Sequence, residues 1–381
     1  MKNWFRNTVI ITLILLCIPL AVKSQKFEYK KVTAVPNFIK SFDEKAKLSE
    51  LKKSNNLVDI TKYLPNNPNK EGKVDYTEYL QKGINENRAI LMPNFPILIN
   101  DNGLDIPNNT LVVFNLNSQI KLSPSDKTNY QVLRMHNKSN VTVYSPKIIG
   151  DRYEHLNTKG EWGMGISIVS SSNISIYNAN ITNCWGDGIY LGQRNGKTNE
   201  NIKIEHALID NNRRNGISVI SVDGLEMSNV IISNTNGTSP ESGLDFEPNH
   251  NSEFLKNINV NNLYTFNNKT NGVVVYLARL RGSVQKDVSI TINNHTDRYS
   301  RISLGYSSVV IQNKNDKQID VPLKGFINYI NVDSYNSKHA FRVYDGSIND
   351  EINVKLKPKI KSKYNKISNS SSFNKIKVTT K

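Results

Sequence analysis

A phrase built on the pattern Gly-x-Gly-Ile repeats along the middle of the chain and constrains its fold more than any other feature. The phrase reads Gly-Met-Gly-Ile-Ser-Ile at 163–168 and Gly-Asp-Gly-Ile-Tyr-Leu at 186–191, and related versions return at 214–219, 241–246 and 270–275. The steps between its central glycines are 23, 28, 27 and 29 residues. A period of this length is typical of solenoids, in which each repeat packs against its neighbours.

Each repeat contains short runs in which apolar and polar residues alternate, which is the period of a strand. A second phrase has the same spacing and begins at Asn140, Asn173 and Asn201 with Asn-Val-Thr-Val, Asn-Ile-Ser-Ile and Asn-Ile-Lys-Ile. Asn, Gly, Asp and Ser separate the runs, as they do in turns, and no helical pattern lies between them. The sequence therefore predicts an all-β chain wound into coils about 4.8 Å apart, which is a parallel β-helix.

The apolar positions of the repeat predict the core of this solenoid. The residues expected to stack inward are Ile166, Ile168, Ile189, Leu191, Ile217, Val219, Leu244 and Phe246. The recurring Asn residues at the turns are expected to form ladders of side-chain amides along the axis. Cys184 is predicted to be a small buried residue of the stack, without a disulfide partner in the mature chain.

The first 24 residues have the pattern of a signal peptide. Lys2 and Arg6 precede an apolar run that is too short to span a membrane comfortably, and the run ends in a segment that fits cleavage after Ser24. We therefore expect a secreted or periplasmic protein without a membrane span.

The segments that flank the repeats are expected to have separate roles. Residues 25–72 are predicted to be an N-terminal extension with a helix between Phe38 and Lys53. A second short helix is expected to begin near Asp75, with Glu78 at capping-box spacing, and to cover the open first coil.

The β-helix itself is predicted to occupy residues 73–350. Its first strands are expected at Ala89–Leu98 and Thr110–Leu122, with prolines at the corners. A Lys-rich tail, residues 351–381, follows and is expected to add one last strand at Ile352–Leu356.

The net charge of +16 is concentrated at the ends of the chain. The tail from Glu351 to Lys381 has nine Lys and one Glu, whereas residues 54–350 carry 29 basic and 28 acidic residues. No interleaving of aromatic and basic residues points to nucleic acid. We interpret the tail as a solvated segment, and the alternative is that it adheres to anionic glycans or cell surfaces. We expect a monomer.

Residues that carry chemistry collect at the corner before each Gly-Ile strand. A long excursion at 151–162 interrupts one coil, and long loops in compact repeats are usually functional. Equivalent corners of neighbouring coils lie about 5 Å apart, so their acids, arginines and Trp residues are expected to share one outer face. Aromatic rings, arginines and paired acids together suit a polysaccharide groove, since arginine binds carboxylates and paired acids transfer protons.

Four acids are the candidate catalytic residues: Asp187, Asp245, Glu247 and Glu161. Asp245 and Glu247 alternate with apolar residues and are expected to point outward. Asp187 paired with Asp245 or Glu247 would suit an inverting glycosidase, with carboxyl groups about 6.5–9.5 Å apart, and Asp187 with Glu161 would suit a retaining one at about 5 Å.

The same face supplies the candidate substrate-binding residues. Arg279 and Arg281 flank Leu280 and are expected to face the same way. The full set comprises Trp162, Trp185, Arg213, Arg214, His155, His250, Tyr276, Arg279 and Arg281. No spacing specifies a metal site, and calcium is the one cofactor that the acids suggest.

Several of these segments resemble the pectate-lyase-like right-handed parallel β-helix superfamily. The resemblance rests on residues 148–155, 161–166 and 183–192, and on the pattern around Tyr79–Ile84, within a region of roughly 75–350. The superfamily includes polysaccharide lyases, polygalacturonase-like hydrolases, alginate epimerases and tailspike depolymerases, so the resemblance implies a right-handed coil and a polysaccharide substrate. The Gly-His-Gly motif of polygalacturonase-like enzymes is absent, and only Asp187 and Asp245 match their acids.

Three functions follow as hypotheses. The first is hydrolysis of a polysaccharide, expected to be acidic, by a carboxylate pair. The second is β-elimination of a uronate-containing glycan, with an Arg, His or Tyr base and calcium as a candidate cofactor. The third is binding of a glycan without catalysis.

Overall fold

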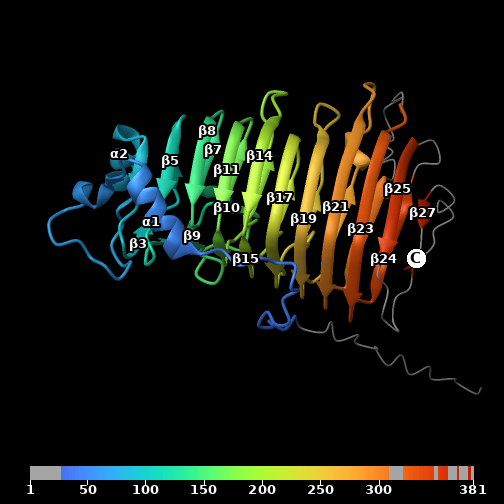
Figure 1. The fold of residues 1–381 in the computed structure, drawn as a ribbon, viewed down its shortest axis with the longest axis horizontal. Coiled ribbons are helices and arrows are strands. Elements are labelled where there is room, and N and C mark those ends of the chain that lie inside the picture. Colours follow the sequence, from blue (N-terminus) through green and yellow to red (C-terminus); the bar gives the residue numbers. More distant parts are fainter. Residues whose placement is uncertain (1–26, 309–320, 347–350, 359–366, 369–375, 379–381) are drawn as a thin grey trace, which may run out of the picture.

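The computed structural model describes residues 27–308, 321–346, 351–358, 367–368 and 376–378. It is a right-handed parallel β-helix, as the repeat and the resemblance together predict, with short helices at its N-terminal end (Figure 1). The expected signal peptide and most of the Lys-rich tail lie outside the described residues. No helix in the described part of the chain is long and apolar enough to cross a membrane.

The strands form two parallel sheets that run the length of the solenoid. The Gly-Ile phrases form the ten-stranded sheet. Its strands are β4 (Leu104–Asp105), β7 (Asn129–His136), β10 (Trp162–Val169), β13 (Ile189–Gly192), β16 (Ile217–Val219), β18 (Leu244–Phe246), β20 (Asn271–Tyr276), β22 (Ile302–Ser308), β24 (His339–Gly346) and β26 (Ile367–Ser368).

The second sheet has 17 strands and includes the Asn-Ile phrases. Early coils contribute two short strands each, and from β17 onward most coils contribute one long strand. Its strands are β1 (Val58–Asp59), β2 (Ala89–Leu91), β3 (Pro96–Ile99), β5 (Thr110–Val113), β6 (Gln119–Leu122), β8 (Ser139–Tyr144), β9 (Lys147–Ile149), β11 (Ser172–Tyr177), β12 (Asn180–Thr182), β14 (Asn199–Glu205), β15 (Leu208–Asp210), β17 (Val222–Ser233), β19 (Leu255–Phe266), β21 (Asp287–Arg298), β23 (Lys324–Tyr335), β25 (Glu351–Pro358) and β27 (Ile376–Val378).

The register of the ten-stranded sheet brings the repeated phrase into line from coil to coil. Ile189 of β13 pairs with Ile166 on one side and with Ile217 on the other, and the row continues to Leu244. All eight residues predicted to stack inward are fully buried, and Cys184 is buried beside them. The apolar pattern of the repeat therefore forms the core that was predicted.

The predicted amide ladders are present at the turns of the 17-stranded sheet. The Asn173 amide donates to Asn140 at 3.0 Å, and the Asn201 amide donates to Asn173 at 3.2 Å. Asn140, Asn173 and Asn201 all have a positive φ near 55°. Asn tolerates this left-handed conformation better than most residues and can hydrogen-bond its copy in the next coil.

Two helices precede the first coil. α1 (Glu44–Ser54) begins later than the predicted start at Phe38, because the Asp43 carboxylate caps it by accepting from the Ala46 amide. α2 (Thr77–Glu86) covers the open end of the core with Leu80 and other buried residues.

The predicted capping box at the start of α2 is wrong. Asp75 accepts a hydrogen bond from the amide of Thr77, two residues later, and the N-cap position is Tyr76, which makes no side-chain cap. The helix is preceded by a 3₁₀ helix, η1 (Ile60–Tyr63), in the N-terminal extension.

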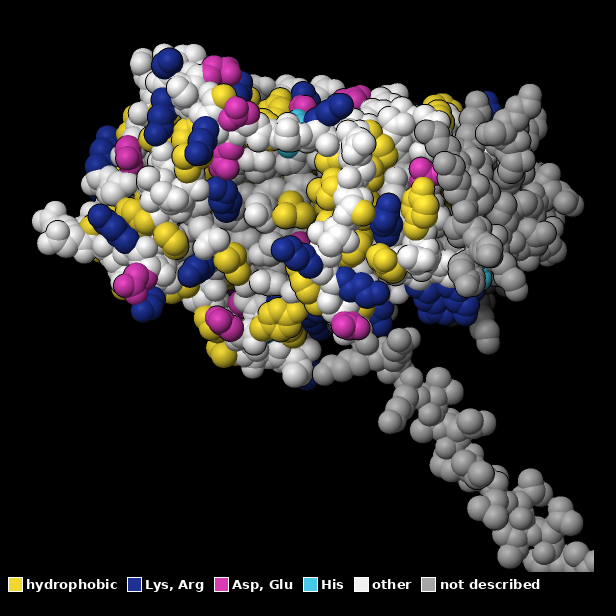
Figure 2. Space-filling view, turned by 60° about the horizontal axis from the view of Figure 1, so that its bottom comes forward, with side chains coloured by type: hydrophobic (Ala, Val, Ile, Leu, Met, Phe, Trp, Pro, Cys, Tyr) yellow, Lys and Arg dark blue, Asp and Glu magenta, His cyan; other side chains and the backbone are white. Residues whose placement is uncertain are grey.

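The N-terminal extension also crosses coils that are remote in sequence (Figure 1). The backbone amides of Lys30 and Lys40 donate to the side chains of Asn234 and Asn229, and the Tyr264 hydroxyl donates to the carbonyl of Thr33. Figure 2 shows the molecule turned so that this side comes forward, with Lys and Arg side chains scattered rather than gathered in one patch.

Candidate functional site

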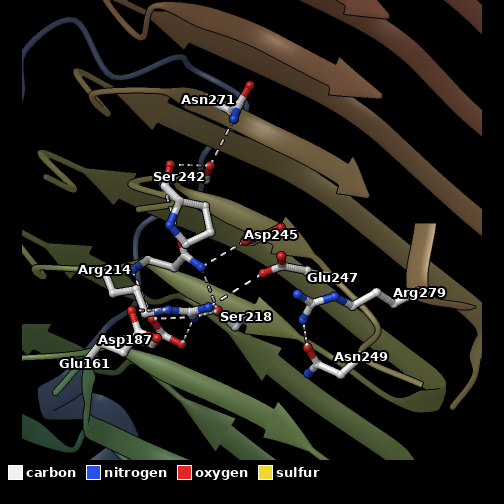
Figure 3. A network of polar contacts seen from close by, with 12 residues as sticks. Glu161, Asp187, Arg214, Ser218, Ser242, Asp245, Glu247, Asn249, Asn271 and Arg279 are labelled. Carbon is white, nitrogen blue, oxygen red and sulfur yellow. Dashed lines mark hydrogen bonds and ion pairs between the residues drawn. The ribbon is translucent and has the colours of Figure 1, made fainter. Parts of the chain in front are cut away.

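Arg214 lies at the centre of a cluster of carboxyl groups on the outward side of the ten-stranded sheet (Figure 3). Its guanidinium nitrogens lie 3.1 Å from Asp187, 3.6 Å from Glu247 and 3.8 Å from Glu161. These side chains come from four successive coils, since each corner or strand end of the repeat contributes. The structure thus brings together the acids that were predicted to share one face, including Asp245 described below.

Asp187 is fully buried beneath this arginine. Its carboxylate accepts hydrogen bonds from the backbone amide of Asn215, at 3.0 Å, and from Arg214. Burial raises the pKa of Asp187, although the charge of Arg214 opposes this shift. Asp187 therefore both holds the turn and anchors Arg214.

Asp245 points away from the apolar core, as expected, but its carboxylate is buried by its neighbours. It accepts a hydrogen bond from the side-chain amide of Asn215 at 2.9 Å. Burial and the neighbouring Glu247 raise the pKa of Asp245 well above its usual value. Asp245 is therefore an internal member of the cluster, closed off from solvent.

Glu161 and Glu247 are the two acids of the cluster that reach solvent. Their side chains are 37% and 22% exposed, compared with 13% for Arg214. Burial raises the pKa of Glu247, although Arg214 and Arg279 oppose the shift. Trp162, which follows Glu161 at the start of β10, is 46% exposed.

Arg213 takes no part in the cluster around Arg214 and is half-buried against other groups. Its guanidinium lies 3.7 Å from the Trp185 ring and donates to the carbonyls of Gly160, at 3.0 Å, and of Trp185. The ring of His155 also stacks on that of Trp185, with the ring centroids 4.0 Å apart. The structure therefore places Arg213 and Trp185 under the 151–162 loop, instead of on an open sugar-binding face.

His155 is also engaged within the protein. Its side chain is fully buried, and its Nδ1 lies 2.8 Å from the carboxylate of Asp151. This contact fixes the start of the 151–162 loop, and the hydrogen bond from Arg213 to the Gly160 carbonyl fixes its end. His155 is therefore a support of the loop that carries Glu161.

The expectation that Arg279 and Arg281 face the same way is wrong. The strand β20 ends at Tyr276, and a 3₁₀ turn, η2 (Ala278–Leu280), follows. Arg279 is exposed and donates to the side chain of Asn249 at 3.3 Å, whereas Arg281 is buried and donates to the carbonyl of Ser308. Arg279 alone of the two lies near the cluster, beyond Glu247 (Figure 3).

The last two predicted residues lie at the edge of this face. His250 is exposed in the turn after β18, where its backbone amide donates to Glu253. Tyr276 is half-buried at the end of β20.

Asn215 and Ser218 are members of the cluster that the sequence reasoning missed. Asn215 donates to the Ser218 hydroxyl at 3.0 Å and joins Asp187 to Asp245 through its backbone and side-chain amides. The aligned repeats contain a signal that could have identified Asn215, because it precedes Gly216 just as Asp187 precedes Gly188. Among the residues that the structure describes, no group of three or more His, Cys, Asp and Glu side chains is arranged to hold a metal ion.

No protein-family model matches the chain. Two Bacillus subtilis (strain 168) proteins are similar over part of it: the uncharacterized protein YclG, 31% identical over 160 residues, and the SPbeta prophage-derived uncharacterized protein YorA, 26% identical over 163 residues. Each match covers 38% of this chain, and 27% of YclG or 28% of YorA.

Solved structures share the fold at low sequence identity. The surface adhesin PfbA of Streptococcus pneumoniae is 11% identical, with a TM-score of 0.54 over 81% of this chain and 79% of PfbA. The tailspike gp49 of Acinetobacter baumannii bacteriophage Fri1, a capsular polysaccharide depolymerase, is 13% identical, with a TM-score of 0.53 over 86% of this chain and 62% of gp49. The endo-xylogalacturonan hydrolase of Aspergillus tubingensis is 14% identical, with a TM-score of 0.51 over 77% of this chain and 84% of the hydrolase. These likenesses establish the parallel β-helix fold.

Proposed function

We propose that the protein cleaves a polysaccharide by glycoside hydrolysis on the outward side of the ten-stranded sheet. The observation that carries the proposal is the pair of solvent-reaching acids, Glu161 and Glu247, which flank one guanidinium, that of Arg214. Glycosidases use two carboxyl groups on either side of the scissile bond, one of them kept protonated by a raised pKa.

Glu247 has the properties of the general acid. Its burial raises the pKa of the carboxyl group, so a larger fraction stays protonated near neutral pH. In this role it protonates the oxygen that leaves the sugar ring. Glu161, which is more exposed, is then the second carboxylate, which activates water or attacks the sugar, and the neighbouring Trp162 ring provides a surface for a sugar.

Asp187 and Asp245 take positioning roles in this proposal. Both side chains are buried, so neither meets a polymer at the surface. They instead hold Arg214 and Asn215 beneath the two exposed acids. We therefore propose Glu161 with Glu247 at the reacting bond, in place of the expected pairing of Asp187 with Asp245 or Glu247.

The charges of the site favour hydrolysis over β-elimination. Elimination needs a base that takes a proton from carbon next to a uronate carboxylate. Burial lowers the pKa of Arg214, but the carboxylates around it raise the pKa above its usual value, so the guanidinium stays protonated and does not accept the proton. Burial likewise raises the pKa of Tyr190, on the neighbouring strand β13, to about 12.

The test is digestion of a panel of acidic and neutral polysaccharides with two simultaneous readouts. New reducing ends without ultraviolet absorbance from unsaturated uronates are the expected result. Absorbance that rises with the reducing ends would overturn hydrolysis in favour of elimination. Silence in both readouts, with binding retained, would overturn catalysis in favour of glycan binding.

A further inference from the structure

We infer that the sugar bound at the Arg214 cluster is uncharged or carries an amino group, and is not a uronic acid. The inference rests on the function proposed above and concerns the charge of its substrate. It departs from the expectation of an acidic glycan, which was based on the arginines of the sequence and on the resemblance described above.

Three of the four arginines expected to bind acidic groups of the substrate are instead bonded to groups of the protein. Arg213 donates to two backbone carbonyls and stacks on Trp185. Arg281 is buried and donates to the carbonyl of Ser308. Arg214 is surrounded by carboxyl groups and is 13% exposed. At the centre of the site a uronate would therefore meet the guanidinium of Arg214, which already has acidic partners.

The charges that such a uronate would meet are negative. Glu161 and Glu247 are the most exposed charged groups of the cluster. Even when Asp187 and Asp245 hold protons, the ionised forms of these two acids outnumber Arg214. When Glu247 is also protonated, as the proposed general acid is, Glu161 still cancels the charge of Arg214, so a uronate meets no net positive charge. A like charge at about 4 Å weakens binding about fivefold in a water-like dielectric and far more in a partly buried site.

Arg279 sets the limit of this acidic region. It is exposed beyond Glu247 and donates to Asn249 at 3.3 Å (Figure 3). A positive side chain at this position is able to hold an acidic group further along the polymer. The restriction on charge therefore applies to the sugar next to Arg214, between Glu161 and Glu247.

Matched tetrasaccharides test the inference without depending on turnover. Three uronate tetramers, from polygalacturonate, polymannuronate and polyguluronate, are compared with the same tetramers after chemical reduction of each carboxylate to an alcohol, which removes the charge and keeps the linkage. A glucosamine tetramer supplies the amino-sugar probe. Binding to the mature chain is measured by calorimetry and by Trp fluorescence, and Trp162→Phe assigns the fluorescence signal to this face.

We expect the reduced member of at least one pair, or the glucosamine tetramer, to bind at least about fivefold more tightly than the uronate tetramers. Glu161→Gln should narrow the difference within a pair by a similar factor, since it removes one negative charge. Glu226→Gln, at an exposed acid on β17 of the other sheet, should leave the difference unchanged.

The inference would be overturned if neither a reduced tetramer nor the glucosamine tetramer bound more tightly than the uronate tetramers. This outcome includes equal affinity within every pair, no binding at all, and tighter binding of the uronates. Cleavage of the corresponding polymers is measured separately. Failure to cleave any polymer, with the binding preference intact, would overturn the proposed hydrolysis and leave the charge selectivity established.

Discussion

At the scale of single residues, the chemistry of the site depends most on the protonation of Glu247. Because burial raises its pKa, the acid form that donates a proton persists to higher pH, and activity should fall as the pH rises through that raised value. Replacing Glu247 with Gln should lower kcat about 10²- to 10⁴-fold and remove this decline from the pH profile. Reducing-end assays between about pH 4 and 9 measure both effects.

The matched control for Glu247 is Glu226→Gln on the 17-stranded sheet, which should retain wild-type kcat and its pH profile. A Glu247→Gln enzyme that keeps more than about one tenth of the wild-type kcat would contradict the role of this residue as the general acid.

A second prediction for a single residue concerns Asp297, which is fully buried inside the coil. Burial raises the pKa of Asp297 to about 6 from 3.8, although hydrogen bonds from Ser300, Ser337 and Thr265 oppose the shift. The folded protein therefore holds this proton more tightly than the unfolded chain does. The resulting stabilisation is fully present below about pH 3.8 and is lost as the pH rises through about 6.

Asp297→Asn should remove this pH dependence. Relative to the wild type, the variant should gain about 3 kcal/mol of stability between about pH 3.5 and pH 7.5, as the shift in pKa requires. Thermal unfolding midpoints at several pH values measure the gain, with the exposed Asp287→Asn as the control. A constant difference between variant and wild type across this range would refute the proposed cause.

At the scale of structural elements, the 151–162 loop depends on a stack of side chains at the corner beneath it. Arg213 joins the Trp185 ring to the carbonyl of Gly160, next to Glu161. Replacing Arg213 with Ala should free the backbone at this end of the loop, where the Lys159 side chain is already exposed, so that trypsin cleavage after Lys159 becomes at least about tenfold faster. The rate of the corresponding fragment's appearance by mass spectrometry measures the change.

The same Arg213→Ala variant should lower kcat because Glu161 loses its fixed position, while the circular dichroism of the β-helix stays unchanged. Arg194→Ala, at an exposed arginine in the turn after β13, provides the control. Unaltered proteolysis at Lys159 in Arg213→Ala would show that the stack does not hold the loop.

The elements also differ in how far the sequence could predict them. The ten-stranded sheet followed from the repeated Gly-Ile phrase, because alternation decides which side chains enter the core, and Ile189 and its copies obey it. The directions of the side chains at the corners could not be predicted from this alternation. Arg213 and Arg214 are neighbours whose guanidiniums contact different groups, and a 3₁₀ turn separates Arg279 from Arg281, since these choices depend on contacts across coils.

At the scale of the whole molecule, contacts remote in sequence were the hardest to predict. The N-terminal segment is held by Asn229 and Asn234, about 190 to 200 residues away, through its backbone amides. Backbone groups carry no sequence signal for such a partner. The burial of Asp245 was missed for a related reason, because alternation along β18 predicts its direction away from the core but not the cover that neighbouring coils provide.

The positive charge is the other property of the whole molecule, and in the sequence it lies apart from the residues of the proposed site. Seven Lys residues follow Pro358, whereas the residues from 54 to 350 are nearly neutral. Replacing these seven Lys residues with Gln should leave kcat within about twofold of wild type, because the side chains of the proposed site come from residues 161 to 279. It should also weaken retention on anionic polymers at low salt, measured by affinity electrophoresis. A variant that loses turnover on a soluble neutral substrate would instead show that the tail takes part in the site, and one that keeps full retention would place polymer adhesion on the β-helix itself.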